Sequence, residues 1–415
     1  MTQISMKKQI NRRNFLKIAG VTAAGSFIGV RLSAAGREGL GQTGTAVNVE
    51  WNVSRQLRIP KNKTAIILET KLVSKELGMF PETEQNRYCG WPTIAKLDNG
   101  EIVIVYSGDR DAHVCPWGKT RIIRSKDNGA TWSEPETINN TPLDDRDAGV
   151  IQTLKGTLLV SWFTSLAYAN PAWKDSYKKY FRVAEKIPAE LKDKWLGNWV
   201  RRSVDNGASW GQPVRTSATA PHGPIQLRDG RLLYVGNGTW DGKPALVAEQ
   251  SQDDGLSWQV ISAFKTESGS IQGLSEPHVV ETRSGKLVAM FRNESSDTDK
   301  YLLQSESYDG GKTWTVLHAT PIWGYPPHII ELKNGWLLVV YGHRRKPFAE
   351  KACISKDEGE TWDIQNEITL AEAFNGDHGY PASIQLDDGS IITVYYQQEN
   401  EGEPTSIFTT HWKLK

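Results

Sequence analysis

The chain has 415 residues, of which 38% are hydrophobic, and its formal net charge is +1. This near-neutral balance argues against binding to nucleic acid through bulk charge, and three cysteines are too few for a disulfide framework. A chain of this length usually forms two or three domains, unless a structural repeat accounts for it.

The first 35 residues have the pattern of an export signal. Paired arginines, Arg12 and Arg13, precede Phe15, a mildly apolar run follows from residue 18 to 30, and small residues end at Ala35. This arrangement is typical of a twin-arginine (Tat) signal peptide. The run of about 13 residues is shorter than the roughly 20 that a spanning helix needs, so we expect no membrane span in the mature chain. We expect the protein to be periplasmic or secreted.

Residues 36–62 are polar and rich in glycine, and we interpret them as a linker. A folded domain is then predicted over residues 63–415. Its first segment, Lys63 to Val73, has the composition of a strand but has no turn that would pair it with a following strand.

Two sequence repeats divide the folded domain. The first is a strand, a turn with glycine and a second apolar strand, with the glycine at positions 100, 156, 230, 285, 335 and 389. The second has the pattern S-x-D-x-G-x-[ST]-W and begins at Ser125, Ser203, Ser251, Ser307 and Ser355. Its Asp can accept backbone hydrogen bonds, its Gly can take a positive φ, and its Trp can pack onto neighbouring strands. We interpret this second repeat as a structural hairpin turn that takes no part in chemistry.

Six turns and five hairpins at intervals of roughly 50 to 75 residues are typical of a propeller. The predicted fold class is all-β, a six-bladed β-propeller of four-stranded antiparallel blades. Beyond the two strands that flank its turn, the sixth blade has only one more strand, around Thr405 to Trp412. We therefore expect the N-terminal strand to complete this blade and close the ring, which removes exposed sheet edges.

Blade two carries an insertion, residues 165–200, with an amphipathic helical pattern that is interrupted at Pro188. Because the insertion joins the second and third strands of its blade, it should lie beside the face on which the innermost strands begin. A substrate wall or lid and a surface decoration remain equal alternatives.

Side chains that can do chemistry gather at the face where innermost strands begin and second strands end. Six of the eight histidines are there: His113, His222, His278, His328, His343 and His378. Arginine, acidic and aromatic residues share these positions: Arg110, Arg146, Arg292, Arg344 and Arg345; Asp109, Asp111 and Glu276; Trp91, Tyr325 and Tyr380. Such a set suits a saccharide that bears a carboxylate, which arginine binds with charge-assisted hydrogen bonds. The histidines lack the close spacing of metal ligands, so no metal or other cofactor is expected.

The hairpin repeat resembles the Asp-box (BNR repeat) of the sialidase, or neuraminidase, superfamily of six-bladed propellers, and the resemblance covers residues 63–415. Three further segments are similar. The stretch from Ser275 to Arg292 resembles the segment with the catalytic Glu and one arginine of a carboxylate-binding triad. Gly342 to Arg345 occupies the place of another triad arginine, and Gly379-Tyr380 resembles the segment with the Tyr nucleophile.

The resemblance implies an exo-acting glycoside hydrolase that removes a terminal, acidic sugar from a glycan or oligosaccharide, and we expect a monomer. Glu276 would accept the proton of Tyr380 as the Tyr oxygen attacks, because a neutral nucleophile is not repelled by a substrate carboxylate. Asp109 or Asp111 would protonate the leaving oxygen. The arginines, the histidines and the remaining aromatic residues of the set would bind the substrate.

One position departs from the family. Sialidases begin the first inner strand with Arg-Ile-Pro, whereas this chain has Gly90-Trp91-Pro92 there, and the literal Arg58-Ile59-Pro60 precedes the closing strand. Loss of one of three charge-assisted contacts would weaken carboxylate binding by about 1.5–3 kcal/mol, so a uronate or a neutral sugar is an alternative substrate. Two other functions stay open: a polysaccharide lyase, in which His or Tyr removes the proton beside an arginine-bound carboxylate, and a non-catalytic glycan-binding propeller.

Overall fold

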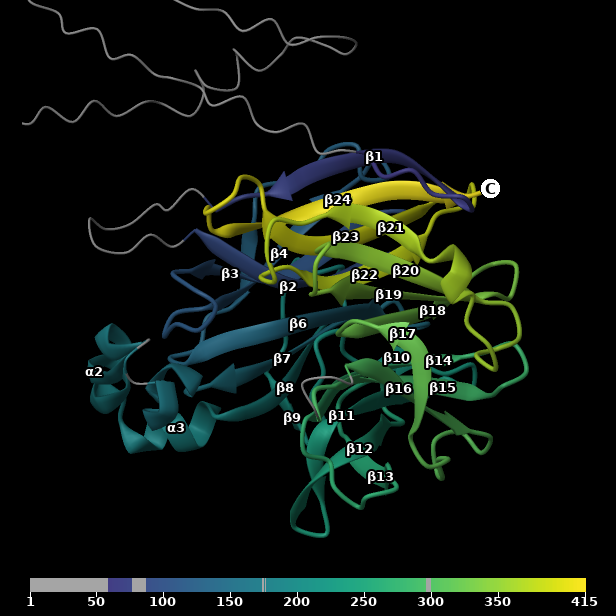
Figure 1. Ribbon diagram of the computed structural model, residues 1–415. Coiled ribbons are helices and arrows are strands. Elements are labelled where there is room, and N and C mark those ends of the chain that lie inside the picture. The colour runs from purple at the N-terminus through teal and green to yellow at the C-terminus, as the bar shows by residue number, and fades with distance from the viewer. Residues whose placement is uncertain (1–58, 77–86, 174, 176, 296–299) are drawn as a thin grey trace, which may run out of the picture. The chain divides into compact units, whose positions relative to one another are not determined.

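A computed structural model describes residues 59–76, 87–173, 175, 177–295 and 300–415 (Figure 1). The predicted signal peptide and most of the predicted linker lie outside the described residues, as does Arg58. In the part of the chain that the structure describes, no helix is long and apolar enough to cross a membrane.

The described residues form six four-stranded antiparallel sheets, so the predicted six-bladed propeller is confirmed. Blades one to three contain β2 (Tyr88–Lys96), β3 (Ile102–Arg110), β4 (Lys119–Ser125) and β5 (Glu136–Asn139); β6 (Asp144–Gln152), β7 (Leu158–Ser165), β8 (Gly197–Ser203) and β9 (Val214–Thr216); β10 (Ile225–Gln226), β11 (Leu232–Trp240), β12 (Lys243–Ser251) and β13 (Gln259–Ala263). Blades four and five contain β14 (Leu274–Glu281), β15 (Leu287–Asn293), β16 (Tyr301–Ser307) and β17 (His318–Trp323); β18 (Pro327–Glu331), β19 (Leu337–His343), β20 (Ala349–Ser355) and β21 (Ile368–Glu372).

Blade six closes the ring, as predicted. It contains β22 (Gly379–Gln385), β23 (Ile391–Gln398) and β24 (Thr405–Leu414), and its outer strand is the N-terminal β1 (Ala65–Ser74). β1 pairs antiparallel with β24, with Ala65 opposite Leu414 and Leu72 opposite Phe408. Apolar faces of neighbouring blades pack on one another, for example Ile104 of blade one on Val394 of blade six. This packing between blades forms the core.

The Asp-box turns join the third and fourth strands of five blades and are held by their own hydrogen bonds. In the first, Asp127 Oδ1 accepts from Ser125 Oγ and from the Thr131 backbone N–H, both at 2.8 Å, and Oδ2 accepts from Thr131 Oγ1 at 2.5 Å. Trp132 Nε1 donates to Gly129 O at 3.1 Å. The hydrogen bonds from Thr131 and Ser125 lower the pKa of Asp127 to about 2. The turn is therefore a closed structural unit.

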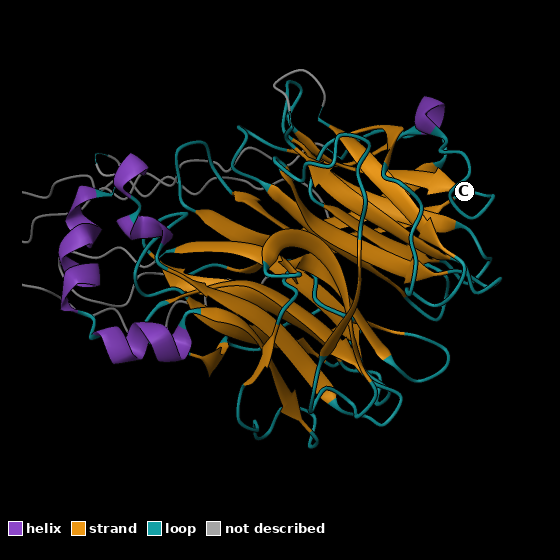
Figure 2. Cartoon of the chain, turned by 90° about the horizontal axis from the view of Figure 1, so that it is seen from below, coloured by secondary structure: helices purple, strands orange, loops and turns teal. Residues whose placement is uncertain are grey.

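The insertion of blade two folds into short helices between β7 and β8: η1 (Ala167–Ala169), η2 (Pro171–Trp173), α2 (Lys178–Lys186) and α3 (Ala189–Trp195). α2 is fixed to blade one because Tyr180 Oη donates to Asp111 at 2.9 Å and its ring packs on Trp117. Figure 2 shows these helices at one end of the strands and the C terminus at the other. β22 runs in the same direction as β24, so Tyr380 at the start of β22 lies at the helical end.

Candidate active site

Four innermost strands begin with the same irregularity. The strand register shifts at Trp91 in β2, Asp147 in β6, Glu276 in β14 and Tyr380 in β22. Each of these four residues has a left-handed backbone, with φ of 55°, 50°, 49° and 50°. A non-glycine residue in this region is strained, and such bulges redirect side chains next to active sites. The four bulges bring side chains from four blades to the same level at the helical end of the propeller.

Tyr380 and Glu276 meet at the distance that the sequence predicts. Tyr380 Oη donates a 2.7 Å hydrogen bond to Glu276 Oε1. Arg292 Nη1 donates to Glu276 Oε2 at 2.6 Å and lies 3.2 Å from Tyr380 Oη. Burial and then the charge of Glu276 raise the pKa of Tyr380 well above its usual value. Burial also raises the pKa of Glu276, but Arg292 outweighs this and lowers it. The pair is thus a neutral phenol beside a carboxylate.

The two neighbouring arginines of blade five point to different places. Arg344 Nε donates to His378 O at 2.7 Å, and its guanidinium lies 5.4 Å from the ring centroids of Tyr325 and Tyr380. Arg292 lies 4.4 Å from the same Tyr325 ring, so the two guanidinium groups are close enough to act on one anion, as predicted. Arg345 instead packs on the Trp323 ring at 4.2 Å and is exposed. Only Arg344 of the two belongs to the site.

Each of the two aspartates predicted as the catalytic acid forms an ion pair with a lysine. Asp109 is ion-paired with Lys119. Asp111 is ion-paired with Lys179 of α2 at 3.2 Å, and its side chain is 3% exposed. In the described chain, neither has a hydrogen bond or ion pair to Tyr380 or to Glu276. The structure therefore does not bring them to Tyr380 and Glu276.

Asp147 of blade two is an acidic residue at the site face to which the sequence assigns no role. Its Oδ1 is buried without a hydrogen-bond partner among the described residues, and Arg146 Nε lies 3.9 Å away. Burial raises its pKa to about 7, against the pull of Arg146, and its charge acts on both Glu276 and Tyr380. A sequence signal existed: residues 91, 147, 276 and 380 each lie nine positions before their turn glycines, 100, 156, 285 and 389.

Trp91 fills the floor of the site in blade one. Its ring is fully buried between the guanidinium groups of Arg110, at 4.8 Å, and Arg146, at 4.4 Å. Arg110 is itself fully buried and makes a two-point ion pair with Asp144, at 2.6 and 3.0 Å, so it has a structural role and its predicted substrate contact is wrong. A side chain at Gly90, the position of the family's triad arginine, would meet the ring of Tyr88 at 3.4 Å.

Three predicted substrate-binding histidines form a buried cluster instead. The rings of His222, His278 and His328 lie 4.3 to 5.8 Å apart, and all three are at most 6% exposed. Burial lowers their pKa values, to about 4 for His278, so they are neutral. His278 lies two residues after Glu276, and His222 bonds to Thr93, two residues after Trp91, so the cluster lies deeper along the inner strands. We correct their role to packing.

The other histidines divide into two kinds. His378 pairs with Glu350 at 2.7 Å, both fully buried, and His343 bonds to Pro347 O and accepts from Arg345, so both have structural roles. His113 remains at the mouth, with a side chain 43% exposed and its ring centroid 4.9 Å from that of Trp91, nearly perpendicular to it. Across the described residues, no group of three or more His, Cys, Asp or Glu side chains is placed to hold a metal ion.

Comparison with known proteins decides the family. Residues 180–393 match the BNR repeat-like domain, which is more than half of the chain. The chain belongs to this family. It is a BNR propeller of six blades.

Solved structures similar to this BNR propeller include a protein of unknown function from Dyadobacter fermentans, at 25% identity and a TM-score of 0.68, with 85% of this chain and 99% of that one covered. The NanB sialidase of Streptococcus pneumoniae is 13% identical, with a TM-score of 0.58 over 82% of this chain and 70% of that one. Trypanosoma rangeli sialidase is 18% identical, with a TM-score of 0.57 over 83% and 60%. The likeness to the two sialidases shows the fold alone.

A curated relative, the xyloglucanase Xgh74A of Acetivibrio thermocellus, is 25% identical over 197 residues. The match covers 40% of this chain, and the chain spans about a fifth (21%) of that relative.

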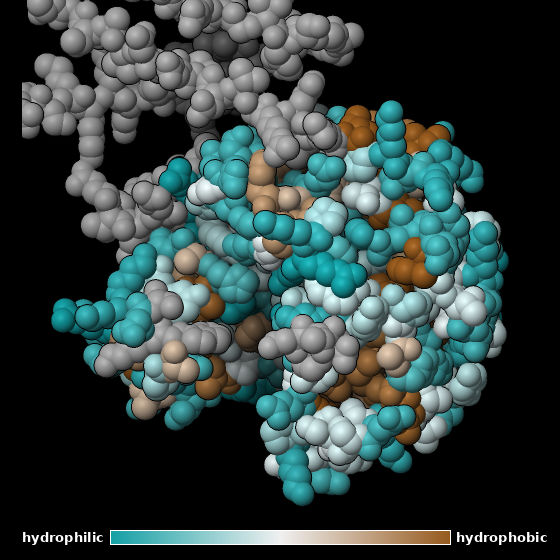
Figure 3. Space-filling model, in the orientation of Figure 1, coloured by the Kyte–Doolittle hydropathy of each residue, from teal (hydrophilic) through white to brown (hydrophobic). Residues whose placement is uncertain are grey.

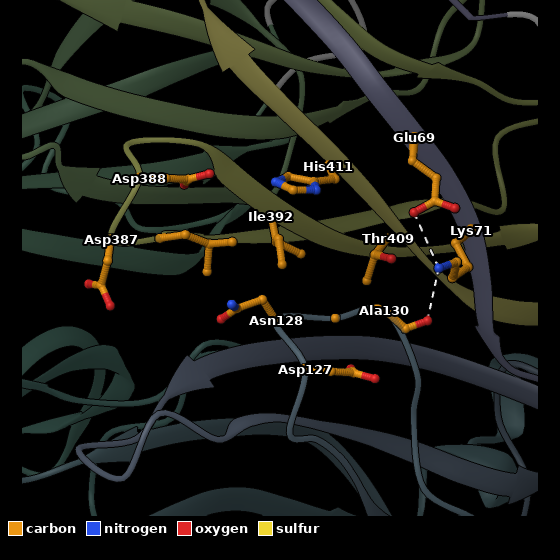
Figure 4. A pocket seen from close by; sticks show the side chains of 12 residues that line it. Glu69, Lys71, Asp127, Asn128, Ala130, Asp387, Asp388, Ile392, Thr409 and His411 are labelled. Atoms are coloured by element: carbon orange, nitrogen blue, oxygen red, sulfur yellow. Dashed lines mark hydrogen bonds and ion pairs between the residues drawn. The ribbon is translucent and has the colours of Figure 1, made fainter.

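A cavity of about 460 Å³ lies beside the turn that follows β22, at the opposite end of this strand from Tyr380. Figure 4 shows the side chains that line it. Residues of the first Asp-box turn, including Asp127, line one side, and the turn after β22, including Asp387, lines another. Lys71 spans its edge by pairing with Glu69 at 3.2 Å and donating to Ala130 O at 2.9 Å. The cavity is therefore a gap between blades six and one, outside the site.

Figure 3 shows one face of the molecule, which is mostly hydrophilic and has apolar side chains in separate patches.

Proposed function

We propose that this BNR propeller is an exo-acting glycoside hydrolase that removes a terminal, acidic sugar from a glycan. The observation that carries the proposal is the 2.7 Å hydrogen bond between Tyr380 Oη and Glu276 Oε1, with Arg292 bonded to both. Sialidases and a xyloglucanase among the similar proteins support a glycan substrate.

The pair has the chemistry of an activated nucleophile. Glu276 is ionised at neutral pH and accepts the Tyr380 proton as the phenol oxygen attacks the anomeric carbon. A glycosyl–tyrosine intermediate results, which water then hydrolyses. Arg292 also pairs with Glu294 at 2.5 Å, so its charge is largely committed to orienting the pair.

The remaining positive charge belongs to Arg344 and Arg146. Arg344 bonds through Nε and Nη2 to His378 and Tyr396, and its Nη1 has no hydrogen-bond partner among the described residues. Arg146 packs over Trp91 and has a buried Nε without a described hydrogen bond. These two guanidinium groups are the anion-binding elements of the proposal, in place of a three-arginine triad.

The test is a panel of 4-nitrophenyl glycosides, including the N-acetylneuraminide, the glucuronide and neutral glycosides, read for released nitrophenol. We expect release from one acidic glycoside, and a loss of about 10³-fold or more in kcat for Tyr380→Phe, because that variant lacks the nucleophilic oxygen. Circular dichroism and thermal melting of the same variant check that it is folded. A Phe variant with near-full activity would exclude the mechanism.

A polysaccharide lyase is the second candidate, favoured by the partly exposed His113 beside Arg146, since a neutral imidazole near an anion-binding arginine can remove the proton beside a carboxylate. Elimination creates an unsaturated uronate with its own ultraviolet absorbance, and hydrolysis does not. Incubation with a uronate-containing oligosaccharide therefore separates the two functions.

A further inference from the structure

We infer that His113 is the acid/base residue on the leaving-group side of the site, and that Tyr88 and Asp377 position it through a chain of hydrogen bonds. The inference rests on the proposed function and names the group that the aspartates of blade one do not supply.

A chain of hydrogen bonds, here called the relay, connects the partly exposed imidazole of His113 to a carboxylate. Tyr88 Oη lies 3.0 Å from His113 Nδ1 and donates to Asp377 Oδ1 at 2.8 Å. The relay joins blade one to the segment before β22, whose second residue is Tyr380. The Tyr88 ring is buried, whereas the His113 side chain is 43% exposed.

The hydrogen bonds fix the tautomer of His113. Burial raises the pKa of Asp377, but bonds from His113 and Tyr88 outweigh this and lower it, so Asp377 is an ionised acceptor. The single Tyr88 proton is donated to Asp377, and Nδ1 of His113 lies 3.0 Å from Tyr88 Oη and 3.5 Å from Asp377 Oδ1, so both neighbours of Nδ1 are acceptors and Nδ1 carries a proton. This leaves Nε2 of neutral His113 as a base, and of charged His113 as an acid. Nε2 has no hydrogen bond in the described residues.

Exposure separates His113 from the acidic candidates. A leaving group is the rest of the glycan, so the group that protonates it must reach solvent. Asp111 is 3% exposed and Asp147 is 7% exposed, and Asp109 is held by Lys119. Asp147 also shares the level of the Tyr380 bulge, which places it with the floor that holds the sugar. Of these four described residues, His113 alone combines a titratable group, an open side and contact with the floor through Trp91.

The reaction balances with these groups. In the first step His113 Nε2–H⁺ gives its proton to the glycosidic oxygen, the bond from that oxygen to the anomeric carbon breaks, and the Tyr380 oxygen bonds to the carbon while Glu276 takes its proton. In the second step water gives a proton to neutral His113, its oxygen bonds to the carbon, and Tyr380 leaves and regains its proton from Glu276.

The charges that face His113 set its pH range. Tyr88 and Asp377 lie on one side, Arg146 of β6 and Arg344 after β19 act from others, and Tyr177 of the insertion lies beside Arg146 and Asp377. Burial first, and then Arg146, lower the pKa of His113 below 6.5, against the hydrogen bond to Asp377, which raises it. The acid form of His113 is lost as pH rises through this pKa. Turnover of glycosides with poor leaving groups should therefore fall as pH rises through the mildly acidic range, below 6.5.

The experiment compares His113→Gln on two substrates of the acidic sugar that the panel identifies, the 4-nitrophenyl and the methyl glycoside. We expect a loss in kcat/KM of about 10²–10⁴-fold on the methyl glycoside but less than about 10-fold on the nitrophenyl glycoside, which needs no acid. His343→Gln, at the matching strand end of blade five, is the control and should change neither. Equal losses on both substrates would overturn the inference, as would no loss.

A measurement without turnover separates this inference from the hydrolase proposal. Nitrogen NMR of the histidines, assigned with His113→Gln, should show neutral His113 as the Nδ1–H tautomer, and Asp377→Asn should lower its pKa because the carboxylate that stabilises the imidazolium is gone. Tyr88→Phe should move the basic limb of the pH profile while sparing the nitrophenyl rate. An Nε2–H tautomer overturns the relay. A correct tautomer in a protein that releases no nitrophenol refutes the hydrolase and leaves the relay standing.

Discussion

The two ends of the propeller use the same backbone conformation for different purposes. At the Asp-box end, left-handed φ values belong to glycines and to the turn residues Asn128 (54°), Asn206 (55°), Asp254 (63°) and Glu358 (53°), in turns closed by their own hydrogen bonds. At the helical end, they belong to Trp, Asp, Glu and Tyr. Asn adopts this conformation readily, whereas a bulky residue does so only when its surroundings impose it. The same conformation therefore closes local turns at the Asp-box end, whereas at the helical end it occurs at strand bulges that redirect side chains.

The largest effect that sharpens this contrast should come from the two arginines of blade five. Arg344→Met should raise KM for an acidic glycoside about 10²-fold, because it removes a charge-assisted bond at the site. Arg345→Met should change KM less than about 3-fold, since its guanidinium packs on Trp323 away from the pair. Steady-state kinetics of both variants on one substrate make the comparison. Equal effects of the two substitutions on KM would show that Arg345 also belongs to the substrate-binding site.

A second prediction concerns the unpaired carboxyl of Asp147. Its pKa is raised from 3.8 in water to about 7 in the folded protein, so the folded state holds a proton that the unfolded state releases. Stability is therefore lost as pH rises from about 4 to 7, and Asp147→Asn should escape this loss. We expect the variant to exceed the wild type by about 1–3 kcal/mol in unfolding free energy above pH 7, and by nothing below pH 4. Chemical unfolding across this range measures it, and a difference independent of pH would refute the shift.

The smallest effect should come from the Asp-box end. Asp253 accepts from Ser251 Oγ and the Ser257 backbone N–H at 2.8 Å and from Ser257 Oγ at 2.5 Å, and Asp253→Ala removes all three bonds. Unfolding free energy should fall by about 1–2 kcal/mol, while the substrate preference across the nitrophenyl panel stays the same. A changed preference would show that the two ends are coupled.

The fold could be predicted because its signals are local and repeated. The turn glycines and the S-x-D-x-G-x-[ST]-W hairpins depend on bonds within a few residues, so they are legible in the sequence. The place of Glu276 and Tyr380 was legible for the same reason, as both hold a fixed offset from a turn glycine.

The hydrogen-bond and ion-pair partners of the site residues could not be predicted from the sequence, because they come from distant parts of the chain. Asp111 is occupied by Lys179, 68 residues later, and His378 by Glu350, so two candidates that look open in the sequence are engaged in the fold. Arg344 and Arg345 are adjacent in the sequence, and the path of the chain after β19 decides which of the two side chains reaches the site. Asp147 has the same offset from its turn glycine as Glu276 and Tyr380, but no family motif singles it out.

The closing strand has a consequence for the order of assembly. Thr70 of β1 and Thr410 of β24 share a hydrogen bond across 340 residues of sequence. During synthesis β1 leaves the ribosome first and has no partner until β24 follows, so blade six is the last to form. Tyr380 lies in this blade, whereas Glu276 lies in blade four. Tyr380 and Glu276 therefore come together only when the ring closes, so the candidate site is the last part of the propeller to be assembled.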